Sequence, residues 1–338
     1  MAVAALAVPW QASAFDHPSP GVGPGANGAR YATDAYPGFD SEDSQIKPER
    51  KEPKWFAFIN GPDCSNAKDQ FEYCTNLAEE GNYSKARKQF DALVREWPTA
   101  PEAPKAQLAI ADICFSQLND YEDAFAEYRY LLDFYSLQCD FAKIADKLYE
   151  TAGILKLEGK EVMFIRFANT VDVRRAYESC VLRAPGAKWV TEAMLIIGQL
   201  REDEGKYGQA VKVYENLRNL YPDSVDAKLA IGREAAVRML ILRDHEYNRH
   251  RCQDTINFMQ LALRTCNKED MSAIQDYLNE AKELIEREDF LGAKFYDSTT
   301  RTKRSAISAY EKFLADYPQG DRSDWVRERL VDLKGESK

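Results

Sequence analysis

The feature that most limits the fold of this 338-residue chain is a helical motif that recurs from Ala67 onward. Its clearest copy, residues 191–224, reads TEAMLIIGQLREDEGKYGQAVKVYENLRNLYPDS. Each copy has a helix with a small residue near its centre, a tight turn, and a second helix that carries an aromatic residue. Equivalent aromatic residues fall at Phe90, Tyr128, Tyr177, Tyr214, Phe258 and Tyr310. Such units must stack, because one helix pair cannot bury its apolar face alone.

Simple stereochemistry accounts for the motif. Glycine or asparagine at the turn tolerates the left-handed backbone that larger side chains resist. Gly198 and Ala210 allow the two helices to approach closely, and Tyr214 fills the gap against the next unit. Pro222 ends the second helix because proline cannot continue it. This is the tetratricopeptide pattern, and it predicts an all-α, right-handed α-solenoid of five to six tetratricopeptide-like helix pairs over residues 64–334.

Two segments with different compositions precede the repeats. Residues 1–14, MAVAALAVPWQASA, join an apolar stretch to Ala-Ser-Ala, the pattern of a signal-peptidase site, although no Lys or Arg precedes Arg30. Residues 15–63 are rich in proline, glycine and charge, so we expect a disordered tether there. The signal-peptide-like segment predicts export, and the alternative is a flexible cytosolic N-terminus.

Composition argues against several classes of function. With Lys+Arg 45 and Asp+Glu 55, the net charge is −10, which disfavours nucleic-acid binding. No apolar run is long enough to span a membrane. The seven cysteines lack C-x-x-C spacing, the three histidines share no helical face, and no nucleotide-binding or nucleophile motif is present. We therefore expect no enzyme activity, cofactor, metal or small-molecule substrate, and we leave open whether any two cysteines form a disulfide.

In solenoids of this kind the first helix of each pair lines the concave face. This register gives a candidate peptide groove made of Phe71, Thr75, Ala109, Ile113 and Ser116. These residues are apolar or neutral, which suits an extended apolar or aromatic peptide better than an acidic tail. The alternative is that they pack against each other or against the tether.

Two other features are candidates for contacts with partners. Residues 159–170, GKEVMFIRFANT, are too apolar for a free loop, and their candidate hydrophobic residues are Met163, Phe164, Ile165 and Phe167. This insertion either folds back over the solenoid or contacts another protein. A basic cluster stands out on the acidic chain, and its candidate partner-docking residues are Arg301, Lys303 and Arg304. A solvated turn is the alternative interpretation of this cluster.

Two stretches resemble the BamD-type family, the periplasmic tetratricopeptide subunits of the outer-membrane β-barrel assembly machinery. They are FEYCTNLAEEGNYSKARKQFDALVREWPTAPEAPKAQLAIAD (71–112) and KELIEREDFLGAKFYDSTTRTKRSAISAYEKFLADYPQ (282–319). The resemblance implies a non-enzymatic scaffold in the periplasm, at the inner face of the outer membrane, with peripheral membrane association only. The implied partners are a barrel-forming outer-membrane assembly protein, docked at the turn with the basic cluster, and unfolded outer-membrane client segments.

The chain departs from that family in two ways. It lacks the lipid-accepting cysteine, since its first cysteine is Cys64, and it has about one repeat more than is typical. One alternative function is that of a periplasmic cell-division coordinator linked to the Tol–Pal system, although residues 15–63 lack the heptads of such proteins. The other alternative is a cytosolic protein-interaction scaffold.

Overall fold

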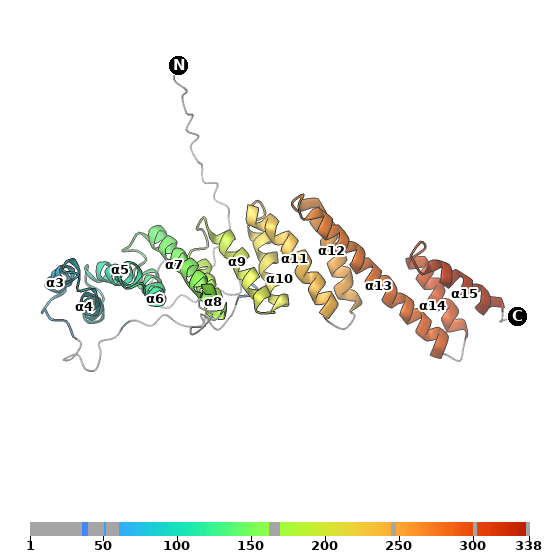
Figure 1. The fold of residues 1–338 in the computed structure, drawn as a ribbon, viewed down its shortest axis with the longest axis horizontal. Helices are drawn as coiled ribbons and strands as arrows, with labels where there is room; N and C mark the ends of the chain where they lie inside the picture. The colour runs from blue at the N-terminus through green and yellow to red at the C-terminus, as the bar shows by residue number, and fades with distance from the viewer. Residues whose placement is uncertain are drawn as a thin grey trace, which may run out of the picture. The chain divides into compact units, whose positions relative to one another are not determined.

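A computed structural model describes residues 36–39, 51, 61–161, 170–244, 248–299 and 303–335. In these ranges the chain forms successive helices and no β-strand (Figure 1). The predicted fold class, an all-α solenoid of tetratricopeptide-like helix pairs, is confirmed. The chain divides into two compact units, and the division falls inside helix α7 (Phe141–Glu161), after Leu155. No helix in the described ranges has the length and apolar character needed to cross a membrane.

The first unit contains two complete helix pairs and the start of a third. Its helices are α3 (Ala67–Glu79), α4 (Tyr83–Glu96), α5 (Ala103–Ile113), the π-helical turn η2 (Cys114–Leu118), α6 (Tyr121–Tyr135) and most of α7. Each helix from α3 to α6 packs against the next. The turns inside the pairs have the predicted left-handed residues, Gly81 with φ 81° and Asn119 with φ 52°. The π-helical turn was not predicted from the sequence.

The second unit continues the same arrangement. Its helices are the end of α7, α8 (Thr170–Arg183), α9 (Val190–Asp203), α10 (Tyr207–Leu220), α11 (Val225–Asp244), α12 (Arg249–Thr265), α13 (Met271–Thr299), α14 (Lys303–Asp316) and α15 (Ser323–Gly335). Neighbouring helices from α8 to α15 pack in chain order, and α11 also contacts both α9 and α13. The first helices of successive pairs therefore stack on one another, as in a solenoid.

The six repeat-defining aromatic residues are all buried, which confirms the repeat register. They lie on the second helix of each pair: Phe90 on α4, Tyr128 on α6, Tyr177 on α8, Tyr214 on α10, Phe258 on α12 and Tyr310 on α14. The small residue at Gly198 has the predicted role, because a Cβ there would lie 2.6 Å from Cζ of Tyr214. Close approach of α9 and α10 thus depends on the missing side chain at this position.

Most of the segment expected to be a tether lies outside the described residues, as does the signal-peptide-like segment 1–14. Within the tether, however, Tyr36–Phe39 pack on the second unit, with Tyr36 and Phe39 buried. Lys51 binds the first unit, where its Nζ lies 2.9 Å from Asp91 and 2.6 Å from Glu127. At these residues the chain is packed against the helices. Stacked rings and ion pairs stabilise contacts that composition alone does not reveal.

Candidate functional site

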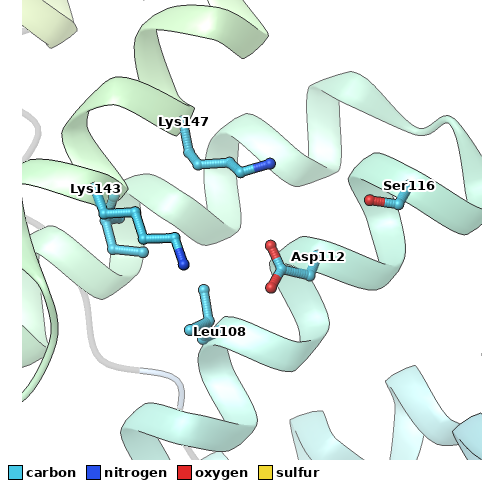
Figure 2. Close-up of a pocket in the computed structure, with 6 residues that line it drawn as sticks. Leu108, Asp112, Ser116, Lys143 and Lys147 are labelled. Atoms are coloured by element: carbon cyan, nitrogen blue, oxygen red, sulfur yellow. The ribbon is translucent and has the colours of Figure 1, made fainter.

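A pocket of about 320 Å³ lies between α5 and α7 in the first unit. Leu108, Asp112 and Ser116 line one wall, spaced four residues apart so that they follow one face of α5 and η2. Helix α7 supplies the other wall with Lys143, Ile144 and Lys147. Figure 2 shows the two lysine side chains reaching from α7 toward the aspartate and the leucine. The pocket therefore combines an apolar floor with charged groups at its rim.

Asp112 is held in place from behind by a buried hydroxyl. The Tyr128 hydroxyl donates a hydrogen bond of 2.6 Å to Oδ1 of Asp112. Burial of Tyr128, together with this carboxylate, raises the pKa of the phenol far above its usual value, so it stays protonated and remains a donor. The carboxylate of Asp112 itself is exposed to the pocket. A repeat-defining core residue thus orients a polar group at the surface.

Two lysines of α7 line the pocket opposite Asp112. Lys143 is exposed, and among the described residues it forms no salt bridge. The Nζ of Lys147 lies 4.6 Å from the centre of the Phe115 ring and 3.9 Å from Glu150. The two ammonium groups thus have two carboxylates near them, Asp112 across the pocket and Glu150 beside Lys147. The Lys143 ammonium is the group available to a carboxylate on an incoming segment.

The residues of the predicted peptide groove lie in different surroundings. Ser116 lines the pocket, but Ile113 is buried and only 7% exposed. Phe71 packs its ring against Phe90, with centroids 5.6 Å apart, and Thr75 donates its hydroxyl to the Phe71 carbonyl at 2.9 Å. These side chains serve their own helix pair.

The predicted groove residues on α5 lie beside the row that lines the pocket. Adjacent residues on a helix point in directions about 100° apart, so Asp112 faces outward while its neighbour Ile113 faces the core. Half-buried Ala109 is likewise one position away from the pocket-lining row that begins at Leu108. The pocket also includes Lys143 and Lys147 of α7, which the first-helix register of the predicted groove did not reach. Their spacing of four residues was the available signal.

The candidate partner-docking residues are at the start of α14. Lys303 and Arg304 lie in its first turn and are exposed, whereas Arg301 lies outside the described residues. Two cations at a helix N-terminus oppose the helix dipole, which costs roughly 0.3–1 kcal/mol each at an exposed site. This placement does not serve helix stability. The insertion residues Met163, Phe164, Ile165 and Phe167 also fall outside the described residues.

Exposed apolar side chains lie close in sequence to this basic turn. Leu291, Phe295 and Tyr296 on the last turns of α13 are each about half exposed or more, and Phe295 reaches 60%. The rings of Phe295 and Tyr296 lie 6.1 Å apart. Since α13 packs against α14, the second helix of the same pair, these residues and Lys303 lie at the same end of that pair. Leu291 and Phe295 are four residues apart on one helix face, and such an exposed apolar pair is the sequence signal for this surface.

The chemistry of the cysteines does not point to catalysis. All seven are free thiols. Burial raises the pKa of Cys74 to about 12 and that of Cys114 to about 11, so both stay protonated near neutral pH. In the described ranges, no group of three or more His, Cys, Asp or Glu side chains is arranged to hold a metal ion.

Comparison with known families identifies the repeat. Two family models described as tetratricopeptide repeat match residues 75–138 and 192–224. These stretches include the α4 to α6 helices of the first unit and the α9–α10 pair of the second. The chain therefore carries tetratricopeptide repeats, and such repeats imply a protein-interaction scaffold. No curated protein shows significant sequence similarity to the chain.

Three of the solved structures that match the chain have low sequence identity to it. A tetratricopeptide repeat protein from Parabacteroides merdae is 15% identical, covering 79% of this chain and 98% of its own, with a TM-score of 0.29. The C-terminal part of a repeat-containing protein from Cytophaga hutchinsonii is also 15% identical, covering 76% and 98%, with a TM-score of 0.25. The Naa15/Naa10 structure bound to HypK-THB is 14% identical, covering 77% and 43%, with a TM-score of 0.24.

Proposed function

We propose that this chain is a non-enzymatic periplasmic scaffold that takes part in the assembly and insertion of outer-membrane β-barrel proteins. The tetratricopeptide repeats support the general role of protein docking. The resemblance of residues 71–112 and 282–319 to the BamD-type family supports the specific process, and the signal-peptide-like segment 1–14 supports export.

The observation that carries the docking role is the α5–α7 pocket. We propose that it holds an extended client segment that presents a carboxylate next to an apolar side chain. The ammonium groups of Lys143 and Lys147 would bind the carboxylate, and the apolar side chain would rest on Leu108 and Ile144. Because tetratricopeptide binding requires no covalent step, the scaffold needs only to hold and release the segment.

A second surface would bind the folded, barrel-forming partner. It comprises Lys303 and Arg304 at the start of α14 and the exposed Phe295 and Tyr296 on α13. Apolar rings next to cations are typical of protein interfaces, in which the apolar part supplies most of the affinity and the charges guide association. The proposed scaffold therefore has two chemically different docking surfaces, each in its own unit.

The pocket is tested with charge reversal. The probe is a library of labelled decapeptides that carry an aromatic residue beside a free C-terminal carboxylate, compared with the same peptides as C-terminal amides. We expect the double variant Lys143→Glu/Lys147→Glu to weaken carboxylate peptides by about tenfold or more, as expected when a charged pair is lost. The matched control, Lys68→Glu/Lys228→Glu, makes the same change of net charge at exposed positions on α3 and α11 and should bind as wild type. Equal binding of both variants, or no preference for the carboxylate, would refute this site.

The envelope role is tested with the natural protein. We expect it in the envelope fraction, beginning at Phe15 after cleavage at Ala-Ser-Ala, and co-purifying with a β-barrel protein of the outer membrane. Charge reversal at Lys303 and Arg304 should abolish that co-purification while leaving peptide binding at the α5–α7 pocket intact. Recovery of the intact chain from the cytosol would instead support the cytosolic scaffold.

A further inference from the structure

Residues Tyr36–Phe39 form a tight turn whose sequence fits its backbone. The backbone N–H of Phe39 donates to the carbonyl of Tyr36 at 3.1 Å, and Gly38 has φ 100°. Proline at the second position and glycine with positive φ at the third are the requirements of a type II turn. The turn brings the two rings together, stacked with centroids 5.2 Å apart and planes 18° apart. This element therefore has a preferred shape of its own.

Helices α9 and α10 donate hydrogen bonds to the outer carbonyls of the turn. Nη2 of Arg201 donates to the Gly38 carbonyl at 2.9 Å, and Nδ2 of Asn216 donates to the Pro37 carbonyl at 3.2 Å. The donors come from different helices and address consecutive carbonyls. The site therefore recognises the backbone conformation of the turn, which any turn of the same type would share.

The aromatic side chains of the turn are also recognised. Tyr36 and Phe39 are 5% and 9% exposed. The Tyr36 hydroxyl forms a hydrogen bond with the Tyr221 hydroxyl at the end of α10, which in turn donates to the Pro185 carbonyl at 3.0 Å. An aromatic hydroxyl thus enters a short chain of hydrogen bonds.

The contact surface leaves no room for a side chain at the third position of the turn. A Cβ on Gly38 would lie 2.9 Å from the Gln209 carbonyl oxygen and 2.9 Å from Cγ2 of Val213. The positive φ already disfavours any other residue there. Glycine is therefore required at position 38 for two independent reasons, the lack of space for a Cβ and the positive φ.

The donor Arg201 is held in place by ion pairs that do not involve the turn. Arg201 has no exposed surface, and its guanidinium pairs with Glu178 at 3.0 Å and Glu204 at 3.5 Å. Arg174 balances the same two carboxylates, at 2.8 Å and 2.7 Å. Because this buried network fixes the guanidinium, little side-chain freedom is lost on binding a carbonyl.

We infer that this surface of α9 and α10, together with Tyr221, is a binding site for type II turns of the aromatic–Pro–Gly–aromatic kind. In this chain Tyr36–Phe39 occupies the site from within the molecule. A partner that presents such a turn competes with the chain's own segment, whose tethering gives it an effective concentration in the millimolar range. Partner binding therefore releases the N-terminal segment from the second unit. The inference does not depend on the envelope function proposed above.

The test uses the full-length chain and a fluorescein-labelled peptide with the sequence of residues 32–43. In the variant Gly38→Val the internal turn cannot dock, while every residue of the helices is unchanged. We expect the peptide to bind this variant at least about tenfold more tightly than it binds wild type, because the internal competitor is removed. Adding Asn216→Ala to the variant should weaken peptide binding. A peptide that itself carries Gly38→Val should bind neither protein.

A second variant, Tyr36→Ala/Phe39→Ala, displaces the internal turn in a different way and should expose the same site. Circular dichroism monitors the helical fold of each variant. If the peptide bound neither of the two folded variants, the inference would be overturned. Equal binding to wild type and to the variants would overturn it too, as would equal binding of the valine-containing peptide.

Discussion

Gly198 provides the sharpest test of how the repeats pack. It lies on α9 directly under the ring of Tyr214, and an added Cβ would lie 2.6 Å from Cζ and 2.8 Å from Cδ1 of that ring. Tyr214 has no exposed surface, and its hydroxyl donates to Glu202 on α9. The ring has nowhere to move without breaking this hydrogen bond. The substitution Gly198→Ala therefore forces α9 and α10 apart.

The expected magnitude follows from two opposing effects. Overpacking a close-packed core by a methyl group costs about 1–3 kcal/mol, and three ring atoms in contact with a fixed tyrosine place Gly198 at the upper end. Replacing glycine by alanine inside a helix restores about 1 kcal/mol of helix propensity. The net expectation is a loss of about 2 kcal/mol in the free energy of unfolding.

Equilibrium unfolding in urea, followed by circular dichroism, measures this loss. Gly292→Ala is the matched control, because Gly292 lies inside α13 and a Cβ there would meet no atom within 4 Å. It should gain up to about 1 kcal/mol from helix propensity alone. The two alanine substitutions thus have opposite expected signs, although the chemical change is the same.

A double-mutant cycle isolates the contact. In a Tyr214→Leu background the obstructing ring is absent, so Gly198→Ala should become neutral or stabilising. A loss below about 0.5 kcal/mol in the wild-type background, or an equal loss in both backgrounds, would refute the idea that α9 and α10 touch at this point.

Three further predictions concern other parts of the chain. Tyr310→Ala should cost about 3–5 kcal/mol by urea unfolding, since it empties a core position, whereas Tyr310→Phe, which loses only the hydrogen bond of 3.2 Å to Asp297, should cost about 1 kcal/mol. The hydrogen bonds from Arg329, at 2.8 Å and 3.1 Å, hold the pKa of Asp297 below its usual 3.8. The stability that these bonds provide is complete at pH values above 3.8. It is lost as the pH falls through the lower pKa of Asp297 in the folded state. Asp297→Asn should therefore flatten the acid limb of the stability–pH curve. Finally, buried Cys74 should resist a thiol reagent at pH 8 until the chain unfolds, while half-buried Cys64 reacts in the native state, as peptide mass spectrometry would show; fast labelling of Cys74 would contradict its burial.

The repeat architecture was predictable because it depends on contacts between residues close in the sequence. The aromatic residue of each second helix, the left-handed turn residues and the small residue at Gly198 all act within one helix pair or between adjacent pairs. Their spacing is therefore visible as a pattern in the chain. Burial of Phe90, Tyr128, Tyr214 and Tyr310 was predicted correctly for this reason.

The α5–α7 pocket was only partly predictable. Ser116 was selected, but Ile113 was chosen instead of its neighbour Asp112, because a pattern of apolar residues does not distinguish a groove from a core. Which row of α5 faces the pocket depends on the rotation of α5 against α7, and packing of the complete pairs sets that rotation. Lys143 could have been found from its spacing with Lys147 on one helix face.

The sequence by itself therefore determined the helix pairs, their turns and their buried aromatic residues, since these follow from local periodicity. Only the tertiary structure decided where the N-terminal segment binds. The hydrogen bond from Arg201 to the Gly38 carbonyl joins residues 163 positions apart, and it depends on a guanidinium that Glu178 and Glu204 hold in place. No periodic pattern encodes a contact of this kind, because its partners share neither a helix nor a repeat. The surface is made by α9 and α10, and a glycine turn from a distant part of the chain fits it.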